Sequence, residues 1–166
     1  GGWLAKKAYP ATVVSLLLSD VVGDSLDVIA SGPTVPDTTT FGDAISILKK
    51  YNIWGKVPSS IRSLLLDGAR GAEPETPKKG DKVFEKVHNL VIGSNRAACL
   101  AAKDELDRKG LKTIFLTSYM EGEAREVGTF LGTLVREIMN SGNPLSRPCA
   151  LISGGETTVT VVGDGK

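Results

Sequence analysis

The chain has 166 residues, 41% of them hydrophobic and 23% charged, as expected of a folded protein rather than a disordered one. Twenty Lys and Arg residues nearly balance nineteen Asp and Glu residues, and the net charge of +1 argues against binding nucleic acid or a membrane surface through bulk charge. Without a membrane-length apolar run or a signal-peptide pattern, the chain is predicted to be soluble and cytoplasmic, with the mitochondrion as the alternative compartment.

The first half of the chain combines short apolar runs with helical patterns. Residues 13–18 are almost entirely apolar, which is typical of a strand covered on both faces. Thr40 and the two threonines before it offer a cap for a helix over 41–51. A second short helix is predicted from Pro58 to about Gly68, and the polar stretch over 67–82 predicts an exposed loop.

The second half of the chain alternates between strand and helix patterns. The expected elements are a strand over 90–95, a helix over 97–109, a strand over 113–117, a helix over about 122–142 and a strand over 150–153. This alternation predicts parallel strands joined by right-handed crossovers. The fold class is therefore predicted to be α/β, with a three-layer, Rossmann-like and mostly parallel sheet.

Two carboxylates follow the first apolar run. Asp20 and Asp24 lie four residues apart around a glycine, and such carboxylates can hold Mg²⁺ or accept the proton of a hydroxyl group, as phosphoryl transfer requires. An alternative stays open, because aspartates in a turn also cap backbone amides.

Three further clusters of glycine and small polar residues lie at the ends of apolar stretches. They occupy residues 30–34, 93–95 and 153–158. Ligands of open parallel sheets bind beyond the carboxyl ends of the strands, where free amides and helix N-termini favour anions. An ordinary helix cap at 94–95 and a plain glycine turn at 153–158 remain the alternatives.

Several common sites are absent from the sequence. Residues 93–98 do not form the Gly-x-Gly-x-x-Gly dinucleotide fingerprint, and there is no Walker phosphate loop. The single histidine, His88, is expected to be a strand-end residue. Cys99 and Cys149 are too far apart in sequence for a metal or redox motif, so both are interpreted as small buried hydrophobic residues.

The two ends of the sequence predict that the chain is part of a longer polypeptide. It begins without Met, and a strand ending at Val162 is predicted to run into a Gly-Asp-Gly turn with no returning strand.

Taken together, the four motifs at 16–24, 28–34, 92–95 and 153–157 resemble the class-II glycerate kinase family. The resemblance spans essentially the whole chain. It implies that residues 1–145 belong to the Rossmann-like N-terminal domain and that residues 146–166 begin a second α/β domain called MOFRL, whose Gly-Lys-Gly-Gly continuation would start at Gly165 and Lys166.

The resemblance also implies an activity, the transfer of a phosphoryl group from ATP to D-glycerate with Mg²⁺. Asp20 and Asp24 would hold the metal or orient the hydroxyl group. Contacts to substrate or nucleotide are expected from Ser31, Gly32, Thr34, Ser94, Asn95, Gly154, Gly155, Glu156 and Thr157. The cation that neutralises the moving phosphoryl group is expected outside this chain.

Two other functions and one assembly stay open at this point. Members of the family also carry the name hydroxypyruvate reductase, although the missing dinucleotide fingerprint counts against that activity. The chain by itself is expected to be inactive, which leaves a non-catalytic folded fragment as the other alternative. A homodimer is a candidate assembly.

Overall fold

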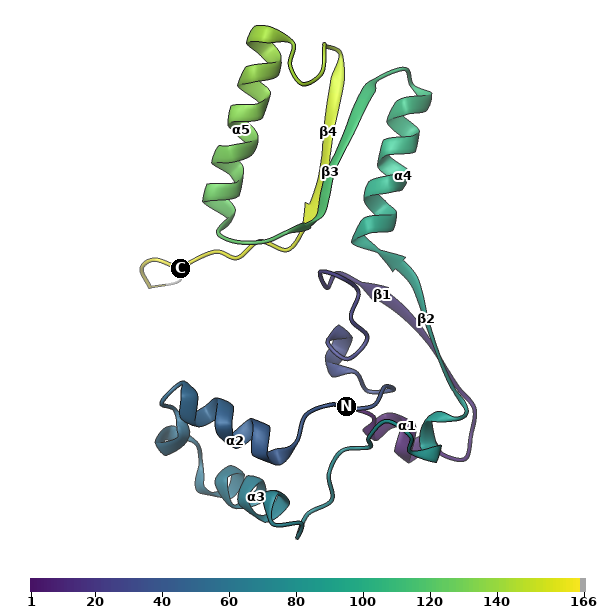
Figure 1. Cartoon of the computed structure of the whole chain (residues 1–166), viewed down its shortest axis with the longest axis vertical. Coiled ribbons are helices and arrows are strands. Elements are labelled where there is room, and N and C mark those ends of the chain that lie inside the picture. The colour runs from purple at the N-terminus through teal and green to yellow at the C-terminus, as the bar shows by residue number, and fades with distance from the viewer. Residues whose placement is uncertain (165–166) are drawn as a thin grey trace. The chain divides into compact units, whose positions relative to one another are not determined.

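The computed structural model of the chain describes residues 1–164, and the expected continuation at Gly165 and Lys166 lies outside the described residues. Helices and strands alternate along the chain, except that α3 follows α2 without a strand between them (Figure 1). In chain order they are α1 (Trp3–Ala8), β1 (Val13–Ser19), α2 (Phe41–Lys50), α3 (Ser59–Ala69), β2 (Val87–Ser94), α4 (Asn95–Arg108), β3 (Lys112–Met120), α5 (Ala124–Ser141) and β4 (Cys149–Gly155). Short 3-10 turns, η1 (Ile29–Ser31), η2 (Trp54–Lys56) and η3 (Lys82–Phe84), lie in the connections.

The chain divides into two compact units. Unit 1 comprises residues 1–16 and 26–90, and unit 2 comprises residues 17–25 and 91–166. Strand β1 pairs with β2, and the division falls inside both strands. Each unit therefore contains residues that are distant in sequence, and unit 2 includes the Asp20 turn together with everything after Leu90.

In unit 1, helices α2 and α3 pack against each other. Helix α2 begins with a capping box, because the Thr40 hydroxyl accepts a hydrogen bond from the Asp43 amide at 3.2 Å while the Asp43 carboxylate accepts one from the Thr40 amide at 2.9 Å. The hydrogen bonds from Thr40 lower the pKa of Asp43. On α3, Gly68 is buried against the ring of Phe41, so that a side chain at this position would collide with the ring.

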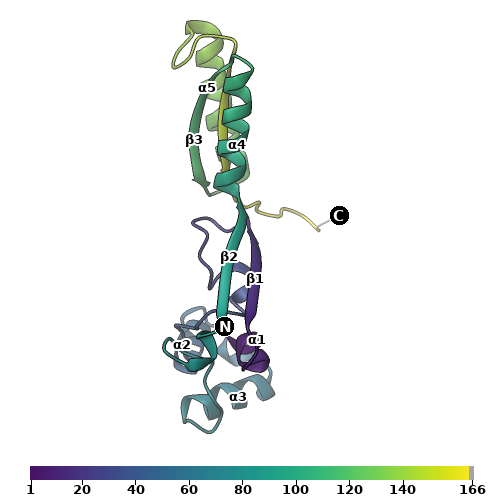
Figure 2. The same ribbon diagram turned by 90° about the vertical axis from the view of Figure 1, so that its right-hand side faces the viewer.

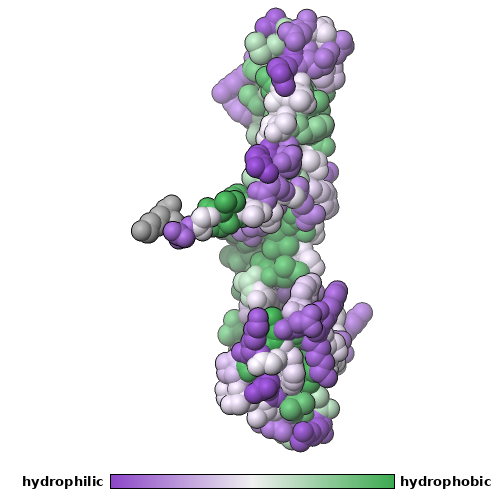
Figure 3. Space-filling view, turned by 90° about the vertical axis from the view of Figure 1, so that its left-hand side faces the viewer, coloured by the Kyte–Doolittle hydropathy of each residue, from purple (hydrophilic) through white to green (hydrophobic). Residues whose placement is uncertain are grey.

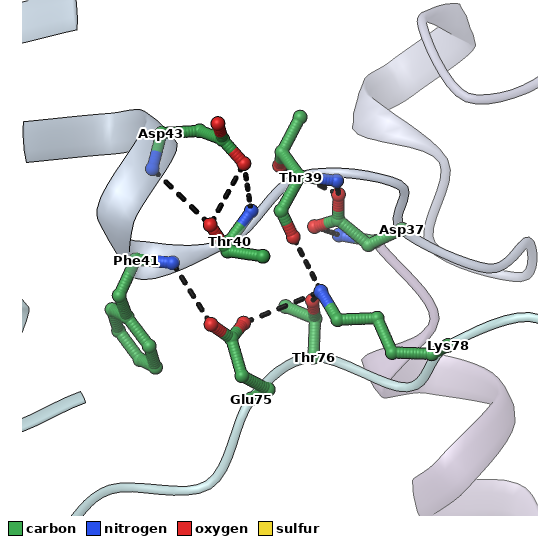
Figure 4. A network of polar contacts seen from close by, with 9 residues as sticks. Asp37, Thr39, Thr40, Phe41, Asp43, Glu75, Thr76 and Lys78 are labelled. Carbon is green, nitrogen blue, oxygen red and sulfur yellow. Dashed lines mark hydrogen bonds and ion pairs between the residues drawn. The ribbon is translucent and has the colours of Figure 1, made fainter. Parts of the chain in front are cut away.

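A polar network joins the start of α2 to the loop around residue 76 (Figure 4). Burial alone would raise the pKa of Asp37, but hydrogen bonds from the Thr39 hydroxyl and amide and from the Thr76 hydroxyl prevail and lower it from 3.8 to about 2. Both Thr39 groups donate to Asp37 Oδ1, the hydroxyl at 2.7 Å and the amide at 2.8 Å. Asp37 is therefore ionised at neutral pH and holds this turn in place.

The same network continues through an ion pair. Glu75 accepts a hydrogen bond from the Phe41 amide at 2.9 Å and pairs with Lys78 at 3.3 Å (Figure 4). Lys78 also donates to the Thr39 carbonyl and to the Thr76 hydroxyl. The 67–82 region, which was predicted to be an exposed loop, thus holds the N-terminus of α2 through its side chains.

Unit 2 has three layers. Strands β3 and β4 are parallel and are joined by α5, and helices α4 and α5 lie on opposite sides of this pair (Figures 1 and 2). Helix α4 packs directly on both strands. The predicted strand–helix–strand crossover and the α/β class are confirmed.

Several boundaries differ from the sequence prediction. Pro58 caps α3 from outside instead of occupying its first turn, and helix α1 was not anticipated. The strand expected to end at Val162 is wrong for the described residues, because the segment after Gly155 makes only an isolated bridge, from Thr158 to Glu123. With no neighbouring strand over its full length, this segment cannot form a ladder.

Both units expose apolar side chains (Figure 3). On α5 the exposed residues are Phe130, Val135 and Met139, and after β4 they are Val159, Val161 and Val162. The buried core of the described residues is small, and it consists of Ala5, Ile29, Val35, Ile45, Val83, Cys99, Ile138 and Ile152.

Candidate functional site

A cavity of about 520 Å³ lies in unit 2, and we call it the Asp20 cavity. Its lining consists of Leu18, Ser19, Asp20, Gly93, Ser94, Asn95, Ala98 and Gly155. Three of the four motifs singled out in the sequence therefore meet at one cavity, although they are separated by more than 130 residues along the chain, from Asp20 to Gly155. The carboxyl ends of strands and a helix N-terminus converge here, as in other open α/β proteins.

Local packing explains the glycine at position 93. A Cβ atom on Gly93 would lie 2.8 Å from Cδ2 of Leu18, so a larger residue at the end of β2 would require the Leu18 side chain at the end of β1 to move. Strand β2 then leads directly into α4, and the Ser94 hydroxyl caps this helix by accepting a hydrogen bond from the Ala97 amide at 3.2 Å. The helix-cap interpretation of Ser94 is confirmed, and Ser94 is also part of the Asp20 cavity lining.

A second, smaller cavity adjoins the same helix start. It is lined by Val21, Gly23, Asp24, Asn95, Arg96, Ser118 and Tyr119. Asp24 adopts a left-handed backbone conformation with φ of 54°, and its amide donates to the Val21 carbonyl at 3.1 Å. The two aspartates thus border different cavities, and Asn95 is the residue that these cavities share.

Arg96 was not identified from the sequence. Both Arg96 and Asp24 line the smaller cavity, while the cation expected outside this chain stays a prediction. The Arg96 guanidinium lies over the Phe115 ring at 5.6 Å from its centroid. Its place in the first turn of a helix that follows a glycine-containing strand end was the signal available in the sequence.

The two glycines at the end of β4 have different tasks. Gly154 lies against α4, because a Cβ atom there would lie 2.7 Å from the Cys99 sulfur and closer still to Oδ1 of Asn95. Gly155 has φ of 153° and packs on the backbone of Met120. The β3–β4 ladder contains register shifts between Phe115 and Thr117 and between Thr117 and Met120. β-Bulges of this kind commonly bend the end of a strand next to a functional site.

The last two predicted residues of this motif lie beyond the strand. The Glu156 amide donates to the Met120 carbonyl at 2.8 Å, while its side chain is exposed. Thr157 is half-buried. Neither residue is part of the Asp20 cavity lining.

The fourth motif, at 31–34, belongs to unit 1. Ser31 is exposed with φ of 62° and lines a different cavity, together with residues 36–39. Gly32 is buried with φ of 57°, and a Cβ atom there would lie 2.7 Å from Cγ2 of Val35. Its carbonyl accepts hydrogen bonds from the amides of Gly2 and Val35, so the turn anchors the start of the chain.

Thr34 is 4% exposed and serves the interior of unit 1. Its hydroxyl donates to Oδ1 of Asn89 at 2.5 Å and accepts a hydrogen bond from the Ser15 hydroxyl at 3.2 Å. The Asn89 amide in turn donates to the Thr34 carbonyl at 3.3 Å. Through these hydrogen bonds Thr34 stabilises the interior of unit 1. A contact from Thr34 to substrate stays a prediction.

The acidic residues do not form a preassembled metal cage. Within residues 1–164, no group of three or more His, Cys, Asp or Glu side chains is arranged to hold a metal ion. Mg²⁺ in phosphoryl-transfer sites commonly takes one or two carboxylates and completes its shell with phosphate oxygens and water. Asp20, at the edge of a cavity with a helix N-terminus, fits that mode of binding. Also among the described residues, no helix combines the length and apolarity needed to cross a membrane.

Comparison with known proteins identifies the family. Residues 1–66 match the family described as Domain of unknown function (DUF4147). Over 165 residues, 99% of its length, the chain is 48% identical to Glycerate 2-kinase of Pyrococcus horikoshii and 41% identical to D-glycerate 2-kinase of Thermotoga maritima. The chain belongs to the glycerate kinase family. The family predicted from the four motifs is thereby confirmed.

A crystal structure of glycerate kinase from Thermotoga maritima shares the fold. It superposes with a TM-score of 0.77 at 40% identity, and the match covers 99% of this chain and 36% of that one. The chain spans 37% and 36% of the length of the two curated relatives. The matched part includes the whole lining of the Asp20 cavity.

Proposed function

We propose that the protein to which this chain belongs is a glycerate kinase that transfers the γ-phosphoryl group of ATP to the 2-hydroxyl group of D-glycerate. The observation that carries this proposal is the 48% identity, over 99% of the chain, to a relative named Glycerate 2-kinase. The name D-glycerate 2-kinase of the second relative supports the choice of enantiomer.

The Asp20 cavity supports the phosphate end of this reaction. Helix α4, which is 14 residues long, begins at the edge of the Asp20 cavity. The free backbone amides of its first turn and the helix dipole favour an anion there. Ser94 and Asn95 supply polar atoms beside these amides, and Gly155 lets backbone approach from β4. These groups would bind phosphate oxygens and hold the nucleotide in position, which is the main source of catalysis in such transfers.

Asp20 is the proposed proton acceptor of the reaction. The substrate hydroxyl oxygen attacks the γ-phosphorus, the bond from that phosphorus to the bridging oxygen of ADP breaks, and the hydroxyl proton passes to the Asp20 carboxylate. Mg²⁺, when bound, would neutralise phosphate charge, and Asp20 and Asp24 are the residues that would hold it. Arg96 would place a fixed positive charge near Asp24 and the phosphates.

The remaining parts of the proposal concern the whole protein. Residues 1–145 would belong to the Rossmann-like domain and residues 146–166 to the start of MOFRL. Ser31, Gly32 and Thr34 of unit 1, and separately Glu156 and Thr157 of unit 2, are the further residues proposed to contact substrate or nucleotide. The chain alone would be inactive, and the whole protein would act in the cytoplasm, with a homodimer as its candidate assembly.

The decisive experiment is an activity assay of the whole protein with ATP, Mg²⁺ and D-glycerate, followed by ³¹P NMR. A phosphate ester on carbon 2 couples to one proton and gives a doublet, whereas an ester on carbon 3 couples to two protons and gives a triplet. We expect the doublet. A triplet would overturn the assignment of the hydroxyl group, and no ester signal would overturn the kinase activity.

The role of Asp20 is tested by Asp20→Asn, which keeps the shape and removes the proton acceptor. We expect the turnover to fall on the order of 10²- to 10⁴-fold while unfolding stays cooperative. The matched control is Asp104→Asn, the same change on the exposed face of α4 in the same unit. An unchanged rate in Asp20→Asn would show that Asp20 is only a turn residue.

A thermal-shift titration separates the kinase from the reductase alternative. ATP at about 100 times its Kd should stabilise the folded protein by about 2.7 kcal/mol, whereas NADH should have no effect. Stabilisation by NADH and not by ATP would reverse the assignment.

A further inference from the structure

Asn95 occupies a special place at the start of α4. It is the first residue of the helix, it is half-buried, and it lines both the Asp20 cavity and the smaller cavity around Asp24. A side-chain amide in this place can present either an oxygen or an NH₂ group to a ligand, because the two ends have nearly the same shape. Only the NH₂ end attracts a phosphate oxygen, so the orientation of this amide matters for binding.

The structure holds the oxygen end of this amide on the inner side. Cys99 lies one helical turn after Asn95, is 7% exposed, and donates its thiol proton to Asn95 Oδ1 with an Sγ–Oδ1 distance of 3.6 Å. Gly154 of β4 packs against the same oxygen, since a Cβ atom there would be nearest to Asn95 Oδ1 and 2.7 Å from the Cys99 sulfur. Oδ1 is therefore enclosed by the thiol and by the backbone of β4.

The other end of the amide has no hydrogen-bond partner among residues 1–164. Among the hydrogen bonds of residues 1–164, the only one that involves the Asn95 side chain is the contact from Cys99 to Oδ1. Nδ2, at the other end of the planar amide from Oδ1, is thus available as a donor on a residue that lines both cavities.

We propose that Cys99 is a positioning residue of the site: its thiol fixes the Asn95 amide with Oδ1 inward, so that Nδ2 donates to a phosphate oxygen of the bound nucleotide. This proposal rests on the proposed kinase function for the identity of the ligand. It also refines the interpretation of Cys99 as a small buried hydrophobic residue, because the thiol makes a polar contact in addition to packing. If the thiol proton is removed, the amide can turn over and present Oδ1, which repels phosphate.

The kinetic test uses a matched pair of substitutions in the whole protein. Cys99→Ser keeps a proton donor of similar size, whereas Cys99→Ala removes it. The loss of one hydrogen bond predicts that Cys99→Ala raises the KM for ATP about three- to tenfold with little change in kcat, and that Cys99→Ser stays within about twofold of the unchanged protein. Cys149→Ala is the control, since the Cys149 sulfur contacts the Leu145 carbonyl and not the site.

A double substitution shows whether Cys99 acts through Asn95. In an Asn95→Ala background, Cys99→Ala should cause no further rise of the KM for ATP, because the group that it positions is gone. An additional rise of the same size as in the single variant would overturn the proposal. Equal KM values for Cys99→Ser and Cys99→Ala would overturn it as well, because packing rather than the hydrogen bond would then explain the effect.

A spectroscopic readout separates this proposal from the proposed function. In the whole protein labelled with ¹⁵N-asparagine, Asn95→Asp identifies the Asn95 side-chain amide signals by their loss. These signals should shift in Cys99→Ala and stay near their original position in Cys99→Ser, with or without ATP. If ATP does not bind, the kinase proposal fails, but the comparison of the two Cys99 variants still tests the contact from Cys99 to Asn95. Unshifted signals in Cys99→Ala would refute that contact.

Discussion

Replacing Thr34 by valine tests whether this residue serves the interior of unit 1. Valine has nearly the same shape, so Thr34→Val leaves no cavity and removes only the hydroxyl group. This hydroxyl makes two hydrogen bonds, to Asn89 and from Ser15, at a position that is 4% exposed. A hydrogen bond contributes about 1 kcal/mol net, and the Asn89 oxygen would lose its partner, so we expect a loss of about 2 kcal/mol in the free energy of unfolding.

Urea unfolding followed by tryptophan fluorescence measures this loss, because both tryptophans of the chain, Trp3 and Trp54, lie in unit 1. The corresponding fall of the melting temperature is about 4–8 °C for a protein of this size. Thr38→Val is the control, since Thr38 is exposed and the same chemical change there should cost less than about 0.5 kcal/mol. Equal stability of the two variants would refute the structural role of Thr34, and a loss of activity without a loss of stability would support a contact to substrate instead.

Three further substitutions follow from the geometry. Gly68→Ala should destabilise unit 1 by about 1–3 kcal/mol, because the added methyl group overlaps the Phe41 ring; urea unfolding measures this, and an unchanged midpoint would contradict the packing of α3 on α2. Gly154→Ala should weaken ATP binding in a thermal-shift titration, since the added methyl group would displace the Asn95 amide. Gly132→Ala, at a position on α5 with open space around it, is the control. Equal affinities of the two variants for ATP would contradict the close contact between Gly154 and Asn95. The pKa of Asp37 is about 2, below its ordinary value of 3.8, so its contribution to stability is fully present above about pH 4 and is lost as the pH falls towards 2. Because this side chain is only partly buried, solvent weakens its hydrogen bonds and the contribution is about 1 kcal/mol. Asp37→Asn should therefore show a shallower loss of stability between pH 4 and 2, and an identical pH profile would show that the hydrogen bonds to Asp37 do not stabilise the fold.

The candidate site was only partly predictable from the sequence. The position of Asp20, Ser94, Asn95 and Gly155 after apolar runs predicts a shared site, and the structure brings these residues to one cavity. Asp24 was grouped with Asp20 because of their spacing, yet a left-handed turn directs it to a neighbouring cavity. Arg96 is not predicted as a site residue, because its place in the first turn of a helix after a glycine-containing strand end is a signal that many helices without a ligand share.

Local patterns in the sequence determined the alternation of strands and helices, the caps at Thr40 and Ser94, and the resemblance to a family. These features depend on residues within a few positions of one another, so a short window of sequence contains them. The tertiary structure alone decided that Thr34 is enclosed by Ser15 and Asn89, and that Cys99 and Gly154 hold the Asn95 amide. Such contacts depend on strand pairing and on the packing of α4 against β4, which join residues tens of positions apart and leave no periodic trace in the chain.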